Sequence, residues 1–119
     1  MAGALLSDYN GCGKGYVNDQ PDRPCNIVSV LAAARAALPK TSSVHFERGC
    51  DYTDMDSSGM ASAVSAAAAA DAAVLVVGLI SGFNKEHLQI EGEAHDRVNL
   101  TLPGLQAELI QKVMDAAWS

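Results

Sequence analysis

Aromatic and basic residues are scarce in this chain of 119 residues. Phe, Trp and Tyr make up 5% of it, and 8 Lys and Arg stand against 14 Asp and Glu, for a net charge of −6. Nucleic acids and anionic membranes are bound through clustered basic side chains, so this balance argues against both as partners. No apolar run reaches the ~18 residues that a membrane-spanning helix needs.

Cysteine is also sparse, and its spacing matches no zinc motif. In a secreted chain, a Cys25–Cys50 or a Cys12–Cys25 disulfide would be allowed; the alternative is three small buried thiols. The opening MAGALLSDYN lacks the basic start and the long apolar stretch of a signal peptide. That absence says little if the gene product begins further upstream.

Hydrophobic residues account for 49% of the chain and charged residues for 18%, which is typical of a globular domain or a piece of one. Alanine dominates the apolar share, so a core of small side chains is expected. Local patterns predict a succession of helices and strands. The predicted helices cover 26–38, 54–71 and 102–118, and the predicted strands cover 42–49 and 72–79, with 4–9 as a further short strand.

Each predicted element has a physical basis. Pro39 ends the first helix, and the alanine run of the second is the best helix former. Residues 72–79 are continuously apolar and β-branched, as in a parallel strand covered on both faces. The third helix is expected to be capped at Thr101 or Leu102 with Pro103 in its first turn. The predicted inward faces are Ile27, Val30, Leu31, Ala34 and Leu38 in the first helix, and Leu105, Leu109, Val113 and Met114 in the third.

This alternation predicts an α/β fold, doubly wound, with a mostly parallel sheet and helices on both faces. Residues 44–79 would form a right-handed βαβ crossover. The last helix should return to another strand, but none follows, so the domain looks truncated. Ligands of open α/β sheets bind beyond the carboxyl ends of the strands. The segment 80–100, here called the acidic loop, leaves one such end.

The acidic loop contains Glu91, Glu93, His95 and Asp96 within a few positions. The residues alone allow a solvated acidic surface, one half of an acid/base site, or a metal site without standard geometry. A phosphate loop at GCGKG is rejected, because Lys14 is followed by Gly15 and no helix begins there. A flavodoxin-like nucleotide site has little support, because no Gly-rich phosphate turn follows either predicted strand. His45 is expected to be structural.

Several motifs resemble the carboxyl-side α/β domain of glycoside hydrolase family 3. VVGL at 76–79, EGEAHDR at 91–97 and LPGLQAELI at 102–110 match that family's V-G-L, E-x-E-x-x-D-R and L-P-G-x-Q-x-x-L-[IV] in order. LLSDYNG, RPC and RGCDYTD resemble the short motifs G-N-Y-x-G, P-C and P-G-C of its xylosidase-like branch. The resemblance implies that residues 1–119 are the first part of this domain and that the N-terminal barrel domain is absent.

In that family two carboxylates flank the scissile bond, about 5–5.5 Å apart in retaining enzymes. The nucleophile is an aspartate on the barrel, and the acidic loop supplies the acid/base glutamate. The resemblance assigns that role first to Glu93, three residues before Asp96, and second to Glu91. Because the loop is longer than in many relatives, Glu86 is a remote third. Asp96 and Arg97 are expected to form an ion pair that supports the loop, with His95 beside them.

The resemblance further implies part of a retaining, exo-acting β-D-xylosidase or β-D-glucosidase that needs no cofactor and no metal. Its partners would be the β-xyloside or β-glucoside substrate and the remainder of the enzyme, including the barrel. Its location would be secreted, vacuolar or periplasmic. The chain alone, without the nucleophile, is predicted to be inactive. The alternative is a non-catalytic carbohydrate-binding or interaction module of the same fold.

Overall fold

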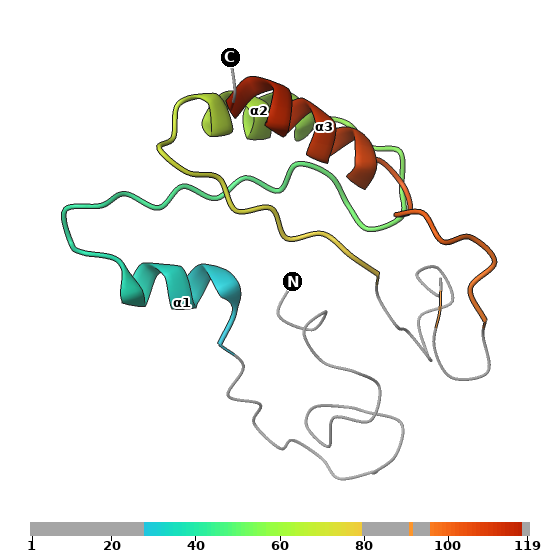
Figure 1. Cartoon of the computed structure of the whole chain (residues 1–119), viewed down its shortest axis with the longest axis horizontal. Coiled ribbons are helices and arrows are strands. Elements are labelled where there is room, and N and C mark those ends of the chain that lie inside the picture. Colours follow the sequence, from blue (N-terminus) through green and yellow to red (C-terminus); the bar gives the residue numbers. More distant parts are fainter. Residues whose placement is uncertain (1–27, 80–90, 92–95, 118–119) are drawn as a thin grey trace, which may run out of the picture. The chain divides into compact units, whose positions relative to one another are not determined.

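The computed structural model describes residues 28–79, 91 and 96–117 (Figure 1). The chain divides into two compact units, one of residues 1–44 and 80–98 and the other of residues 45–79 and 99–119. No helix in the described ranges is long and apolar enough to cross a membrane.

The first unit contains helix α1, Val30–Ala37. Its N-cap is Ser29, whose hydroxyl oxygen accepts a hydrogen bond of 3.1 Å from the Ala32 N–H. The helix ends where the Leu38 N–H donates to the Ala34 carbonyl, directly before Pro39. The helix therefore begins at Val30, later than the predicted start at residue 26. Residues 26 and 27 lie outside the described residues. No residue of α1 is buried, so the inward face predicted for Val30 and Leu38 is not observed.

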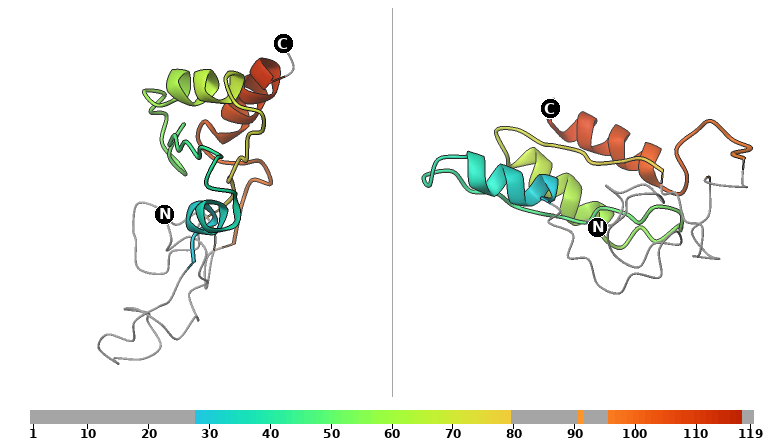
Figure 2. Two further views of the ribbon diagram at one scale, coloured as in Figure 1. Left: turned by 90° about the vertical axis from the view of Figure 1, so that its left-hand side faces the viewer. Right: turned by 90° about the horizontal axis from the view of Figure 1, so that it is seen from below.

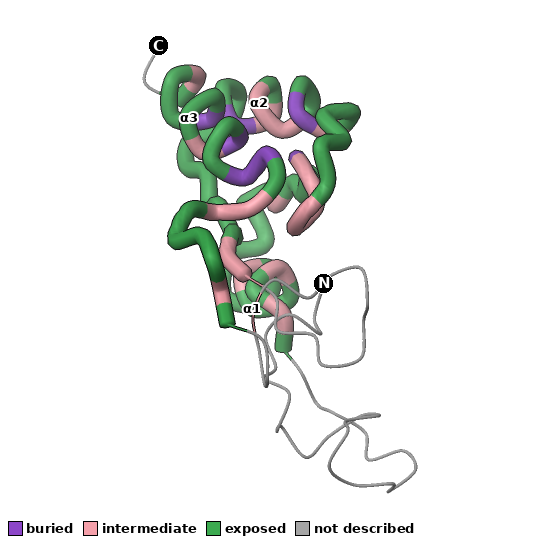
Figure 3. Tube along the Cα trace, turned by 90° about the vertical axis from the view of Figure 1, so that its right-hand side faces the viewer, coloured by how far each residue is buried: buried purple, intermediate pink, exposed green. Residues whose placement is uncertain are grey.

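The second unit is built on two helices that pack against each other, α2 at Met60–Ala68 and α3 at Gln106–Ala117. Only one alanine is among the buried residues, beside a methionine, two leucines and a valine, so the expected core of small side chains is not what the described residues show. Figure 3 shows that the buried positions gather on these two helices and on the turn before α3. The buried apolar residues of the described chain are Met60, Ala67, Leu105, Leu109 and Val113.

Helix α2 begins later than predicted because aspartates bind the backbone before it. The Asp54 carboxylate accepts from the Asp56 N–H at 3.0 Å, and the Asp56 carboxylate accepts from the Ser58 N–H at 2.9 Å. Such local bonds give the backbone an alternative to the helix. The helix then starts after Gly59, without a side-chain cap, and ends at Ala68, with Ala69 as its C-cap.

Helix α3 begins at Gln106, so the predicted cap at Thr101 or Leu102 and the place of Pro103 in the first turn are wrong. Gly104 has a φ of +59°, which lies outside the helical region and separates Pro103 from α3. Leu105 supplies the first helical acceptor, its carbonyl bonding the Leu109 N–H at 2.9 Å. Met114, predicted to face the core, is 48% exposed.

The predicted strands 42–49 and 72–79 are not paired as strands among the described residues, which contain only a single bridge residue, Glu91. In Figures 1 and 2 residues 45–53 and 72–79 run as uncoiled chain on one side of α2 and α3. Exposure alternates along the second segment: Val74 and Val76 are 79% and 65% exposed, whereas Leu75 and Val77 are each 37% exposed. This period of two is typical of extended chain with one covered face, not two. The parallel sheet and the crossover remain predictions.

Candidate functional site

The acidic loop is described at Glu91 and from Asp96 onward; Glu86, Glu93 and His95 lie outside the described residues. Arg97 Nη1 lies 3.7 Å from Glu91 Oε2, and both side chains are partly buried. The predicted pair between Asp96 and Arg97 is not present among the described ion pairs. The Arg97 side chain instead reaches the carboxylate six positions earlier.

Within the second unit, a buried amide side chain lies at Gln106, the first residue of α3. Its side chain is 3% exposed and makes three hydrogen bonds to backbone groups far away in the sequence. Its Oε1 accepts from the Gly78 N–H at 2.7 Å, and its Nε2 donates to the Gly78 and Tyr52 carbonyls, at 2.9 Å each. These three bonds, here called the Gln106 anchor, join the first turn of α3 to Gly78, near the end of the predicted strand 72–79, and to Tyr52, three residues after the predicted strand 42–49.

The Gln106 anchor was not predicted from the sequence, although a signal for it exists. Gln106 stands on the same helical stripe as Leu109 and Val113, three and seven residues later. A polar residue on a buried stripe must find hydrogen-bond partners, because burying an unpaired amide costs about 1–3 kcal/mol. That position therefore indicates a structural amide whose partners the sequence does not name.

Cys50 and the ion pair beside it lie at the end of the first extended segment. Cys50 is a free, partly buried thiol, so the Cys25–Cys50 bridge allowed by the sequence is not formed; the Cys12–Cys25 bridge lies outside the described residues. Burial, followed by the charges of Asp51 and Asp54, raises the pKa of the Cys50 thiol. The Arg48 guanidinium forms an ion pair with the Asp51 carboxylate, three residues later.

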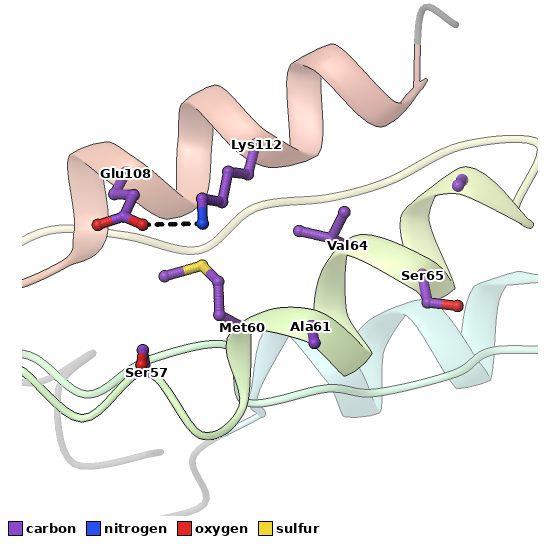
Figure 4. Close-up of a pocket in the computed structure, with 8 residues that line it drawn as sticks. Ser57, Met60, Ala61, Val64, Ser65, Glu108 and Lys112 are labelled. Atoms are coloured by element: carbon purple, nitrogen blue, oxygen red, sulfur yellow. Dashed lines mark ion pairs between the residues drawn. The ribbon is translucent and has the colours of Figure 1, made fainter.

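A shallow cavity of about 530 Å³ opens between α2 and α3 (Figure 4). Met60 and Val64 line it from α2, and an ion pair between Glu108 and Lys112, 2.9 Å between oxygen and nitrogen, borders it from α3. The cavity is mainly apolar, and of the predicted site residues that the structure describes, Glu91, Asp96 and Arg97, none lines it. Within the described ranges, no three His, Cys, Asp or Glu side chains gather as metal ligands would.

Comparison with known proteins now identifies the class. The family model of the glycosyl hydrolase family 3 C-terminal domain matches residues 2–118, so the chain belongs to this family, as the motifs predict. The chain is 36% identical over 114 residues to "Beta-xylosidase/alpha-L-arabinofuranosidase 2" of Medicago sativa subsp. varia, covering 96% of this chain. It is 42% identical over 94 residues to "Beta-D-xylosidase 3" of Arabidopsis thaliana, covering 79%.

A bacterial relative, "Beta-xylosidase" of Formosa agariphila, is 34% identical over 109 residues, covering 92% of this chain. No solved structure matches. The chain spans only 13% of the Medicago and Formosa proteins and 11% of the Arabidopsis protein. It is therefore a glycoside hydrolase family 3 domain whose relatives, in plants and in a bacterium, are xylosidases several times its length.

Proposed function

We propose that this chain is the first part of the C-terminal domain of a retaining, exo-acting β-D-xylosidase. The observation that carries the proposal is the family match over residues 2–118 together with relatives named β-xylosidases. The nucleophilic carboxylate and most sugar contacts would come from the rest of the enzyme, including an N-terminal barrel. A β-glucoside is the alternative substrate.

The acidic loop would supply the carboxyl group that protonates the leaving oxygen and later activates water. We assign this role to Glu93, with Glu91 as the second candidate. The Arg97 contact supports this order, because it engages the Glu91 side chain within the loop and leaves Glu93 for the acid/base role. Glu91 and Arg97 would then brace the loop, together with Asp96 and His95.

The test is a graft of residues 2–118 in place of the matching segment of the Arabidopsis enzyme, assayed on aryl and alkyl β-xylosides. Glu93→Ala should slow an alkyl xyloside by about 10²–10⁴-fold, because its poor leaving group needs protonation. An activated aryl xyloside should be affected far less, and azide should partly restore turnover, since this anion attacks without a base. Glu108→Ala, on an exposed part of α3, is the control.

Three results would contradict parts of the proposal. If Glu91→Ala shows the leaving-group signature and Glu93→Ala does not, the acid/base is Glu91. Equal rates of the full-length parent enzyme, not of the graft, on aryl β-xyloside and β-glucoside would remove the preference for xylose. A graft that binds xyloside but turns over neither substrate would favour the non-catalytic carbohydrate-binding module.

A further inference from the structure

We propose that Asn99 is an acceptor site for N-linked glycosylation. Asn99, Leu100 and Thr101 form the acceptor motif Asn-x-Thr, in which the middle residue is any residue except proline. Asn99 is the only asparagine of the chain that has Ser or Thr two positions later. This inference rests on a secreted or vacuolar location of the parent protein in a eukaryotic cell, and it does not depend on the proposed role of the acidic loop.

The motif lies at the surface, in the irregular segment that leads to α3 (orange in Figure 1). Asn99 and Thr101 are exposed, and Leu100 between them is 84% exposed. The helix begins only at Gln106, so the motif is outside regular structure. The glycosylating enzyme must take the asparagine into its own active site, and a glycan needs room in solvent. An exposed, irregular segment meets both requirements.

A local turn brings the two essential side chains of the motif together. Asn99 Oδ1 accepts hydrogen bonds from the Thr101 N–H and from the Thr101 hydroxyl, at 3.0 Å each. This is an Asx turn, in which an asparagine side chain bonds the chain two residues later. The turn engages the oxygen of the Asn99 amide, so the nitrogen, which is the atom that receives the sugar, lies on the other branch of the amide.

The reaction explains why both hydrogen bonds matter. Asn99 Nδ2 would form a bond to the anomeric carbon of an oligosaccharide whose donor is a lipid-linked pyrophosphate. The bond between that carbon and the pyrophosphate oxygen breaks, the lipid pyrophosphate leaves with the electron pair, and Nδ2 gives up one proton. As the proton leaves, negative charge spreads to Oδ1, where the two donors of Thr101 already point.

A purely structural Asx turn would have the same two hydrogen bonds, so the test detects the modification itself. The full-length graft described above is secreted from cultured plant cells and denatured. A peptide N-glycosidase that accepts plant glycans, used in heavy-oxygen water, converts a glycosylated asparagine into a labelled aspartate. Trypsin in ordinary water then cleaves after Arg97 and Lys112 and releases peptide 98–112, whose only asparagine is Asn99. Mass spectrometry should find the label at this position in most of the peptide.

Paired variants separate the motif from the surface around it. Thr101→Val removes the hydroxyl at nearly the same shape and should abolish the label, whereas Thr101→Ser keeps the hydroxyl and should retain it. Leu100→Pro should abolish the label although Asn99 and Thr101 are unchanged, and Leu100→Ala should retain it. Thr41→Val, at an exposed threonine outside the motif, is the control for loss of a surface hydroxyl.

Two results would overturn the inference. One is a secreted wild-type graft whose peptide 98–112 carries no label, because every secreted molecule has passed the glycosylating enzyme. The other is a label that persists in both Thr101→Val and Leu100→Pro. If Thr101→Val is not secreted, the comparison of Leu100→Pro with Leu100→Ala decides. All these readouts are masses and not rates, so they stand whether or not Glu93 is the acid/base.

Discussion

At the scale of single residues, Gly104 shows why the LPG motif ends in glycine. Its φ of +59° is costly for residues with a side chain, and a Cβ at this position would lie 2.8 Å from the Asp54 carbonyl oxygen. The neighbour is backbone and cannot rotate away. The glycine thus lets the chain turn into α3 while passing close to the segment before α2.

Gly104→Ala should therefore lower the free energy of unfolding by about 1–3 kcal/mol. Urea unfolding followed by circular dichroism measures this change. Ala107→Ser, at an exposed position of α3, is the control and should stay within about 0.5 kcal/mol. An unchanged midpoint for Gly104→Ala would show that the turn relaxes without cost.

Asp56 leads to a prediction of how the stability of the fold depends on pH. Hydrogen bonds from the Ser58 N–H and hydroxyl, at 2.9 and 3.0 Å, lower the pKa of this carboxyl from its ordinary value of 3.8. A carboxyl whose pKa is lower in the folded state stabilises the fold above its ordinary pKa, and this contribution is lost as the pH falls through the lowered value.

Wild type should thus be more stable than Asp56→Asn at neutral pH, with the difference shrinking below pH 3.8. Thermal unfolding at a series of pH values measures it. Asp71→Asn, an exposed aspartate after α2, serves as the control. A difference that persists unchanged at low pH would mean that the amide disturbs the turn itself and that charge plays no part.

At the scale of elements, the sequence predicts the central parts of α2 and α3 but not the residues at which these helices begin. The cores of α2 and α3 follow the alanine run and the stripe of Leu105, Leu109 and Val113. Their starts were wrong because carboxylates bind the backbone before α2 and Gly104 breaks the chain before α3. Strand formation depends on pairing partners, which a local pattern does not contain, so the sheet is untested at 42–49 and 72–79.

The predictability of the site follows the same division. The motif places Glu91 and Arg97 in one loop, and the structure adds their contact. The motif also contains Asp96, and it does not specify which of its carboxylates Arg97 contacts. The Gln106 anchor depends on contacts 28 and 54 positions away and could be suspected from the buried stripe but not specified.

The interface of α2 and α3 should respond strongly to truncation at Leu109. This side chain is buried and lies against Gly49, where a Cβ would come within 2.7 Å of Leu109 Cδ2. Leu109→Ala should cost about 2–5 kcal/mol, because lost burial adds to the cavity left behind. Met114→Ala, on the exposed side of α3, should cost far less. Urea unfolding measures both, and equal losses would contradict the observed core.

At the scale of the whole molecule, the described chain leaves much apolar surface in solvent. Val74 and Val76 present one face of an extended, unpaired segment, and contiguous surfaces of this kind commonly mark interaction sites or lead to association. The relatives that match the chain are several times longer. We expect the remainder of the enzyme to cover this face in the proposed xylosidase.

The isolated chain should therefore associate and should not hydrolyse glycosides. General acid catalysis contributes about 10²–10⁴-fold, but the covalent nucleophile and substrate distortion contribute the rest, and both are assigned to the remainder of the enzyme.

Light scattering should detect assemblies of the 119 residues. A Val74→Lys, Val76→Lys variant should reduce them, because like charges on an extended edge oppose pairing, whereas Ala61→Lys on the exposed side of α2 should not. A stable monomer that cleaves an aryl xyloside, with turnover lost in Glu93→Ala, would show that these residues suffice for catalysis and that the proposed division of labour is wrong.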